Sequence, residues 1–149
     1  MAVCFMTNHY HLLLEVGDGA LPSGMQWLNH AHARAFNRRY GLRGHVFAAR
    51  YDARRIETDE HLLAAFRYIA RNPVDARLCA APGDWPWSSY AGTVGLGEPL
   101  GYVDASAVIG CFGRPAAAAL DRLRIFVEAS QDNLSVPGTV PGTEERRDA

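Results

Sequence analysis

The amino-acid sequence predicts a small α+β domain, and three observations lead to that class. The chain has 149 residues, 48% hydrophobic and 21% charged, which is typical of one globular domain with a single core. Two short β patterns stand at its start, and apolar residues at helical spacing follow them. Every apolar run is shorter than the roughly 20 residues of a membrane helix, so we expect no membrane partner.

Cysteine usage and the first residues predict a compartment. Cys4, Cys79 and Cys111 are odd in number and widely spaced, which argues against a disulfide framework and a structural zinc knuckle. No basic-then-apolar leader precedes the first polar residues. We therefore expect a cytoplasmic protein.

Residues 2–6 and 9–16 predict a β-hairpin, with Thr7 and Asn8 as its polar turn. On the second strand, His9 and His11 are separated by one residue, so they share a face and both imidazoles can reach one metal ion. Two neighbouring histidines alone are more often a coincidence or a local hydrogen-bonding pair.

A long helix and a third strand are predicted next. Pro22 suits a first helical turn, and Gly41 stands where a C-terminal cap belongs. Between them, apolar and aromatic side chains recur at helical spacing: Met25, Leu28, His32, Ala35 and Phe36. Residues 45–57 mix aromatic residues, Val and Arg without a helical period, which favours a strand.

Asp59 begins a second predicted helix, which we expect to end near Arg71 because Asn72-Pro73 is a poor helical pair. Its core stripe consists of Leu62, Leu63, Phe66, Ile69 and Ala70. Tyr68 falls nearly opposite this stripe, either as a partly exposed ring or as a placed hydroxyl. Asn72 follows Tyr68 by four residues and so lies on the same helix face, where the phenol and the amide oxygen can reach the same point.

The remaining chain completes a three-part organisation. Residues 82–92 form a turn-rich loop, and helical patterns resume at Asp104 in two pieces split by Gly113 and Pro115. We expect one domain over 1–92, a helical C-terminal extension over 93–131 and a disordered tail over 132–149.

Positive charge is concentrated between the two predicted sites. All 15 basic residues are arginines, and residues 34–55 contain seven of them with one acid, Asp52. Such a block is a solvated face or a phosphate-binding surface. The candidate DNA-binding residues are Arg34, Arg38, Arg39, Arg50, Arg54 and Arg55. Paired histidines, a tyrosine with an amide and intervening arginines together indicate a phosphodiester site, in which a metal polarises the phosphate and a phenol attacks it.

Three segments carry a family resemblance: MTNHYHLLLE, FRYIARNPVDARL and DWPWSSY. They resemble the REP-associated tyrosine transposases, which belong to the single-tyrosine HUH endonuclease superfamily. The resemblance covers residues 1 to about 92 and continues more loosely to about 130. It implies a ferredoxin-like α+β fold, with an antiparallel sheet and helices on one or both faces.

The resemblance also implies roles for single residues. His9 and His11 match two metal ligands, Asn72 the third, and Tyr68 the nucleophile that forms a 5′-phosphotyrosine link to single-stranded DNA beside imperfect hairpins. The implied function is a metal-dependent single-stranded DNA endonuclease and strand transferase, a cytoplasmic, nucleoid-associated transposase. Mg²⁺ or Mn²⁺ is the implied cofactor, without a nucleotide. Hairpin or single-stranded DNA is the implied partner, and both monomers and homodimers occur in the family.

Two imidazoles and an amide make a neutral ligand set. Imidazole suits Zn²⁺ better than Mg²⁺, which prefers carboxylates and water. We therefore expect weak Mg²⁺ binding until a phosphate adds negative charge, whereas Mn²⁺ tolerates nitrogen better.

The start of the sequence departs from the family pattern and leaves alternatives open. The family has a first strand and helix, some 40 residues or more, before the segment with which this sequence begins, so we expect both to be missing. Thr7, Ala48 and Asp52 are smaller departures. One alternative is a truncated, inactive relic that only binds hairpin or single-stranded DNA. Another is a small domain whose His pair and Tyr are incidental, against which the complete residue set argues.

Overall fold

The computed structural model describes residues 1–129 as an α+β fold with a small antiparallel sheet and five α-helices, which confirms the predicted class. The predicted tail over 132–149 lies outside these residues. The elements in chain order are β1 (Ala2–Phe5), β2 (Tyr10–Leu13), α1 (Ala20–Tyr40), α2 (Asp59–Asp75), the 3₁₀ turn η1 (Pro82–Asp84), α3 (Tyr90–Thr93), α4 (Ser106–Gly110) and α5 (Ala116–Glu128). The architecture is compatible with a ferredoxin-like transposase domain.

The predicted hairpin is present. β1 and β2 pair antiparallel, with Cys4 opposite His11 and Phe5 opposite Tyr10. A backbone bond of 2.8 Å from the Met6 N–H to the His9 carbonyl closes the turn. The segment 87–89 runs along the other edge of β1, where Cys4 and Ser88 form a β-bridge.

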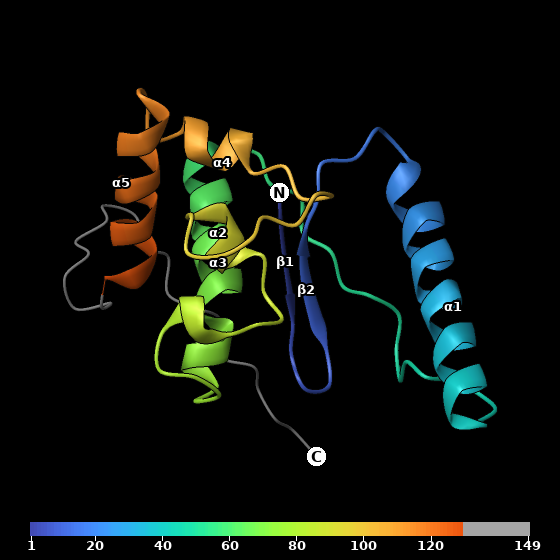
Figure 1. Ribbon diagram of the computed structural model, residues 1–149. Coiled ribbons are helices and arrows are strands. Elements are labelled where there is room, and N and C mark those ends of the chain that lie inside the picture. The colour runs from blue at the N-terminus through green and yellow to red at the C-terminus, as the bar shows by residue number, and fades with distance from the viewer. Residues whose placement is uncertain (130–149) are drawn as a thin grey trace, which may run out of the picture.

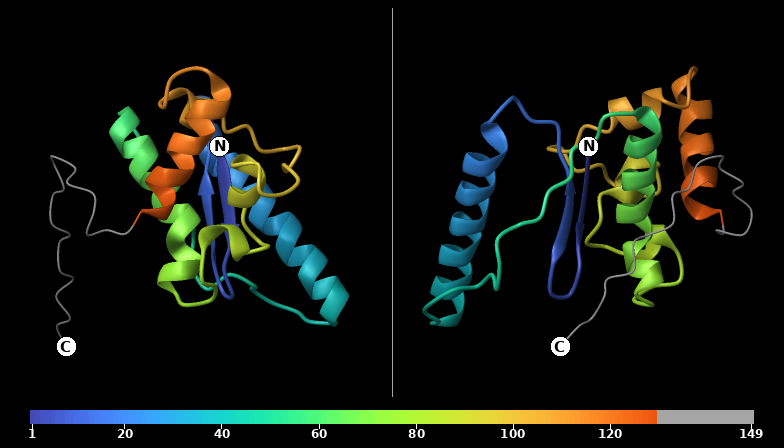
Figure 2. Two further views of the ribbon diagram at one scale, coloured as in Figure 1. Left: turned by 60° about the vertical axis from the view of Figure 1, so that its left-hand side comes forward. Right: turned by 180° about the vertical axis from the view of Figure 1, so that it is seen from behind.

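Helices lie on both sides of the hairpin (Figure 1), with α2 on one side and α1, farther away, on the other, and the view from behind shows the same arrangement (Figure 2). Residues directly opposite in an antiparallel pair share a face. Cys4 and His11 therefore point to one face, and Phe5 and Tyr10 to the other. Cys4 belongs to the same buried cluster as Phe66 of α2, so the His11 face is the one that α2 covers.

One hydrophobic core joins β1, β2 and α2 to the C-terminal helices. The apolar stripe predicted for the second helix faces this core: Phe66, Ile69 and Ala70 are buried, while Leu62 and Leu63 pack against it partly buried. The core also takes side chains from the later elements, namely Tyr90, Val94, Val108, Leu123 and Val127. As predicted, the C-terminal region is helical in two pieces, α4 and α5.

Two sequence predictions about these elements are wrong. Residues 45–57 form no strand: the segment runs from the end of α1 towards α2 without ladder hydrogen bonds, and a strand needs a paired neighbour. The helix α2 does not end near Arg71 but continues to Asp75, with Pro73 inside it. Proline removes only one backbone hydrogen bond there, and its ring is fully buried against the core, which offsets that loss.

The long helix α1 is present as predicted and ends at Gly41, whose φ of 64° is the left-handed conformation that favours glycine. Its predicted apolar stripe is mostly uncovered, because Met25 is the one residue of α1 that is buried. Within residues 1–129, no helix has the length and apolarity to cross a membrane.

Candidate active site

The two histidines of the hairpin converge on one point. His11 lies on β2 and His9 directly precedes it, and their Nε2 atoms are 3.1 Å apart. The ring centroids are 4.9 Å apart and the ring planes nearly perpendicular, at 89°. The two-residue spacing thus places both imidazoles on the same face, as the pattern predicted.

Asn8 fixes the protonation pattern of His9, a role that sequence reasoning missed. The Nδ1–H of His9 donates to Oδ1 of Asn8 over 2.7 Å, since an amide oxygen only accepts. In the neutral ring this bond places the proton on Nδ1, which leaves the Nε2 lone pair to face His11. Metal-binding histidines are oriented by such a partner on the other ring nitrogen. An acceptor beside a candidate ligand histidine is the signal that could have identified Asn8.

Tyr68 and Asn72 reach this histidine pair from α2. The rings of Tyr68 and His11 meet edge to face, with centroids 5.3 Å apart and planes at 82°. Tyr68 remains 58% exposed, as expected for a ring opposite the apolar stripe. Because α2 continues past Arg71, Asn72 stays one helical turn from Tyr68 and also interacts with the His11 side chain.

The surroundings of His11 favour its neutral form. Burial is the main cause that lowers its pKa below the ordinary histidine value, and the neighbouring His9 lowers it further. The interaction with the Asn72 side chain opposes these two effects. A neutral imidazole is the form that binds a metal ion.

The donor set fits a divalent ion. Neighbouring ligands of an octahedral ion that lie about 2.1 Å from it are about 3.0 Å apart, close to the 3.1 Å between the two Nε2 atoms. Within residues 1–129, no group of three or more His, Cys, Asp and Glu side chains is placed to hold a metal. The Asn72 side chain, which interacts with His11, is the neighbouring amide that would complete such a donor set.

Tyr10 lies between the two histidines in sequence but points to the opposite face. Its hydroxyl donates to Oδ1 of Asn29 on α1 over 2.6 Å, and its ring meets Phe47 edge to face. Of the two tyrosines next to the His pair, only Tyr68 has its ring against His11.

Comparison with known proteins gives one match. Residues 1–72 match the family model described as IS200-like transposase. Residues 1–72 belong to the IS200-like transposase family. The matched range includes the histidine pair and Tyr68 and ends at Asn72. No curated protein and no solved structure matches the chain. Membership assigns the protein in general terms to the DNA-cleaving enzymes of transposition and recombination.

The six candidate DNA-binding arginines of this transposase are all exposed and lie apart from the four site residues. Three of them lie on the second half of α1, namely Arg34, Arg38 and Arg39, and three on the segment that follows it, namely Arg50, Arg54 and Arg55. Within residues 1–129, none of the six is hydrogen-bonded to a site residue. Arg55 pairs with Glu57 over 3.9 Å, with both side chains largely in solvent, and the Arg39 guanidinium lies 5.8 Å from the Tyr40 ring centroid. The structure therefore leaves these arginines accessible but does not join them to the histidine pair.

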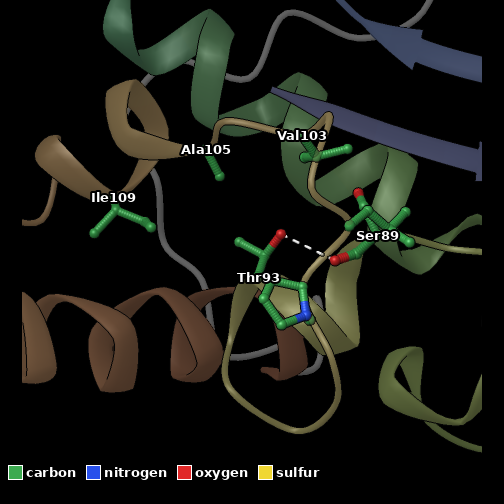
Figure 3. Close-up of a pocket in the computed structure, with 8 residues that line it drawn as sticks. Ser89, Thr93, Val103, Ala105 and Ile109 are labelled. Carbon is green, nitrogen blue, oxygen red and sulfur yellow. Dashed lines mark hydrogen bonds between the residues drawn. The ribbon is translucent and has the colours of Figure 1, made fainter.

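The transposase also has a small cavity of about 170 Å³ at a different place (Figure 3). It is lined by residues between Ser89 and Ile109, and the Thr93 hydroxyl donates to the Ser89 carbonyl over 2.9 Å at its wall. No site residue and no titratable side chain lines it. The candidate active site is thus an open surface between β2 and α2, not this cavity.

Proposed function

We propose that this transposase cleaves and joins single-stranded DNA at sites beside hairpins, with Tyr68 as its nucleophile. The observation that carries the proposal is the contact between the Tyr68 ring and His11, because it brings a phenol to a pair of converging imidazoles. A phenol beside a site for a divalent ion is one arrangement that supports transfer of a phosphodiester, with the phenol as nucleophile and the ion as Lewis acid.

The chemistry of the chain's own residues follows from their positions. The exposed phenol of Tyr68 gives its proton to solvent while its oxygen forms a bond to the scissile phosphorus. The bond from phosphorus to the 3′ oxygen breaks, and that oxygen leaves with a proton from water. The product is a 5′-phosphotyrosine, and a 3′ hydroxyl from another strand reverses the same steps to join DNA.

His9, His11 and Asn72 would hold the divalent ion, Mg²⁺ or Mn²⁺. When bound, the ion supplies Lewis-acid polarisation of the scissile phosphate. Asn8 orients the His9 ring through its Nδ1 atom, and the lowered pKa of His11 favours the neutral form of that ring. The exposed arginines on α1 and on residues 50–55 would bind the flanking phosphates by charge, without reading sequence.

Labelled single-stranded hairpin DNA, incubated with Mn²⁺ and resolved on a denaturing gel, tests the proposal. Wild-type protein should give a protein–DNA adduct, and Tyr68→Phe should give none while binding DNA as before, because only the attacking oxygen is lost. Tyr10→Phe is the matched control, since its hydroxyl is bound to Asn29 on the other face, and it should keep the adduct.

Three results would contradict the proposal. An adduct that persists in Tyr68→Phe removes Tyr68 as the nucleophile, and its loss in Tyr10→Phe alone moves that role to Tyr10. DNA binding without any adduct favours the alternative of a protein that only binds DNA.

A further inference from the structure

The C-terminal end of α5 lies beside the helix that carries Tyr68. The last four carbonyls of a helix have no partner within it and need one from elsewhere. In α5 the Ile125 carbonyl accepts from the Ala129 N–H over 2.9 Å, within the helix's own capping turn. The next two carbonyls, of Phe126 and Val127, are instead bound by side chains of α2.

Two arginines of α2, Arg67 and Arg71, supply these bonds, and we call them the arginine clamp. Arg67 donates from Nε to the Phe126 carbonyl over 2.9 Å and from a terminal nitrogen to the Ala129 carbonyl over 2.6 Å. Arg71 donates to the Val127 carbonyl over 3.2 Å. The planar guanidinium can bind two carbonyls at once, and its charge suits the negative end of a helix dipole.

Further contacts hold the arginine clamp in place on α2, and burial holds the end of α5 that it binds. The side chain of Arg71 is only 18% exposed and pairs with Asp75 over 3.6 Å, while the Arg67 guanidinium lies 5.9 Å from the Phe126 ring centroid. On α5, Leu123 and Val127 are fully buried. The C-terminal end of α5 is therefore packed in the core, and the two arginines attach α2 to it.

The clamp and the candidate site occupy adjacent faces of α2. Arg67 and Arg71 are one turn apart, as are Tyr68 and Asn72, and the second pair is displaced from the first by one residue, or about 100° around the helix. The clamp thus sets the rotation of α2 about its own axis. A rotation of about 10° moves a side-chain tip at the roughly 6 Å outer radius of a helix by about 1 Å.

We propose that Arg67 and Arg71 are positioning residues for the cleavage step, which act by fixing α2 against α5 so that Tyr68 faces the histidine pair. This inference rests on the proposed function. Reacting atoms must be aligned closely, and a displacement of about 1 Å costs up to about 100-fold in rate. The C-terminal helix is then part of the catalytic unit, although it lies beyond the range that matches the family.

Two readouts on the full chain test the proposal. The first is the rate of adduct formation at saturating hairpin DNA, measured together with DNA affinity. The second is the fluorine NMR signal of Tyr68 in protein labelled with fluorotyrosine, identified by its loss in Tyr68→Phe. The variants are Arg67→Gln and Arg71→Gln.

Two controls separate positioning from general stability. Arg122→Gln loses an equal charge and an arginine-to-carbonyl bond, from α5 to Phe112 rather than from α2. Val94→Ala weakens the shared core at the residue that follows α3. We expect the clamp variants to lose about tenfold or more in rate, with unchanged affinity and a shifted Tyr68 signal, and both controls to keep rate and signal.

The proposal is overturned if the Tyr68 signal stays unmoved in the clamp variants, or if Val94→Ala loses as much rate as they do. If the glutamine variants do not fold, Arg67→Lys and Arg71→Lys keep the charge but not the double donor, and should shift the signal and rate in the same direction. An unchanged lysine variant then contradicts the proposal. If the wild-type protein forms no adduct, the proposed function is wrong. The fluorine signal of Tyr68 still shows in that case whether the arginine clamp positions Tyr68.

Discussion

The two faces of the β1–β2 hairpin differ in how well protein covers them. On the first face, Cys4 and Leu13 are buried beneath α2, and the core continues through α2 to Val127 of α5. On the second face, Phe5 remains 47% exposed, and α1 is tied to the sheet by the bond between Tyr10 and Asn29. Met25 is the buried residue of that 21-residue helix.

This difference separates two kinds of task. A nucleophile must be held closely, and the candidate site lies where α2 is packed against both the sheet and α5. Phosphate contacts depend mainly on charge and accessibility, and the candidate arginines lie on α1 and the segment after it, where little covers them. We therefore expect changes on the packed face to affect stability, and changes on the α1 side to affect DNA binding.

The largest expected difference is between two phenylalanines. Phe66 of α2 is 1% exposed in the core, whereas Phe36 of α1 is 37% exposed and contacts Tyr40. Phe66→Ala should cost about 3–5 kcal/mol in the free energy of unfolding because it leaves a cavity. Phe36→Ala should cost about 1 kcal/mol or less. Urea unfolding followed by circular dichroism measures both, and equal losses would contradict the comparison.

Replacing either of two glycines with alanine should change the free energy of unfolding, but in opposite directions. A Cβ at Gly92 would lie 2.6 Å from the Glu98 carbonyl oxygen and 2.8 Å from the Pro99 Cα, so Gly92→Ala should cost about 1–3 kcal/mol. A Cβ at Gly24, inside α1, meets nothing within 4 Å. Gly24→Ala should therefore stabilise by about 0.5–1 kcal/mol. Thermal unfolding of the two variants checks the signs, and a destabilised Gly24→Ala would show that α1 is packed after all.

The arginines of α1 provide a test by salt dependence. Replacing Arg38 and Arg39 with Gln should weaken binding to single-stranded DNA of any sequence and reduce the salt slope by about 1.4, or about 0.7 for each lost phosphate contact. The same double change at Arg122 and Arg124 of α5 is the charge-matched control and should leave the slope unchanged. Fluorescence anisotropy over a salt series gives both slopes, and equal slopes would make the α1 arginines a solvated face.

Alkaline pH should weaken the packed face selectively. Burial raises the pKa of the Cys4 thiol to about 11. Burial is also the main cause that raises the pKa of the Tyr90 hydroxyl. Both groups stay neutral in the folded protein at pH values where the unfolded chain ionises them. Their contribution to stability is therefore complete below about pH 9 and is lost as pH rises towards 11 and beyond.

By linkage, the expected loss from Cys4 is about 1 kcal/mol at pH 10. Urea unfolding at pH 8 and pH 10 measures it, and Cys4→Ala should reduce the difference between the two. An equal pH dependence in this variant would contradict the assignment to Cys4.

Local spacing in the sequence predicted much of what lies within single elements. The apolar period of residues 59–71 predicted which side of α2 is buried and left Tyr68 on the opposite side, where it is 58% exposed. The hairpin and the end of α1 at Gly41 were predicted correctly from turn and cap residues. The end of α2 was not, because the burial of Pro73 against the core outweighs its poor local preference.

What the sequence alone determined is therefore the set of local relationships: His9 with His11 on one face of the hairpin, and Tyr68 with Asn72 one helical turn apart. The roles assigned to these residues, and to the six arginines, remain predictions. Only the tertiary structure decided that the first pair meets the second, because the face that α2 covers depends on apolar surface shared with distant residues such as Leu123 and Val127. It also left residues 45–57 without a strand partner and joined Arg67 and Arg71 to α5. Backbone periods act over a few residues, whereas these contacts span more than 50 positions and form only when the core assembles.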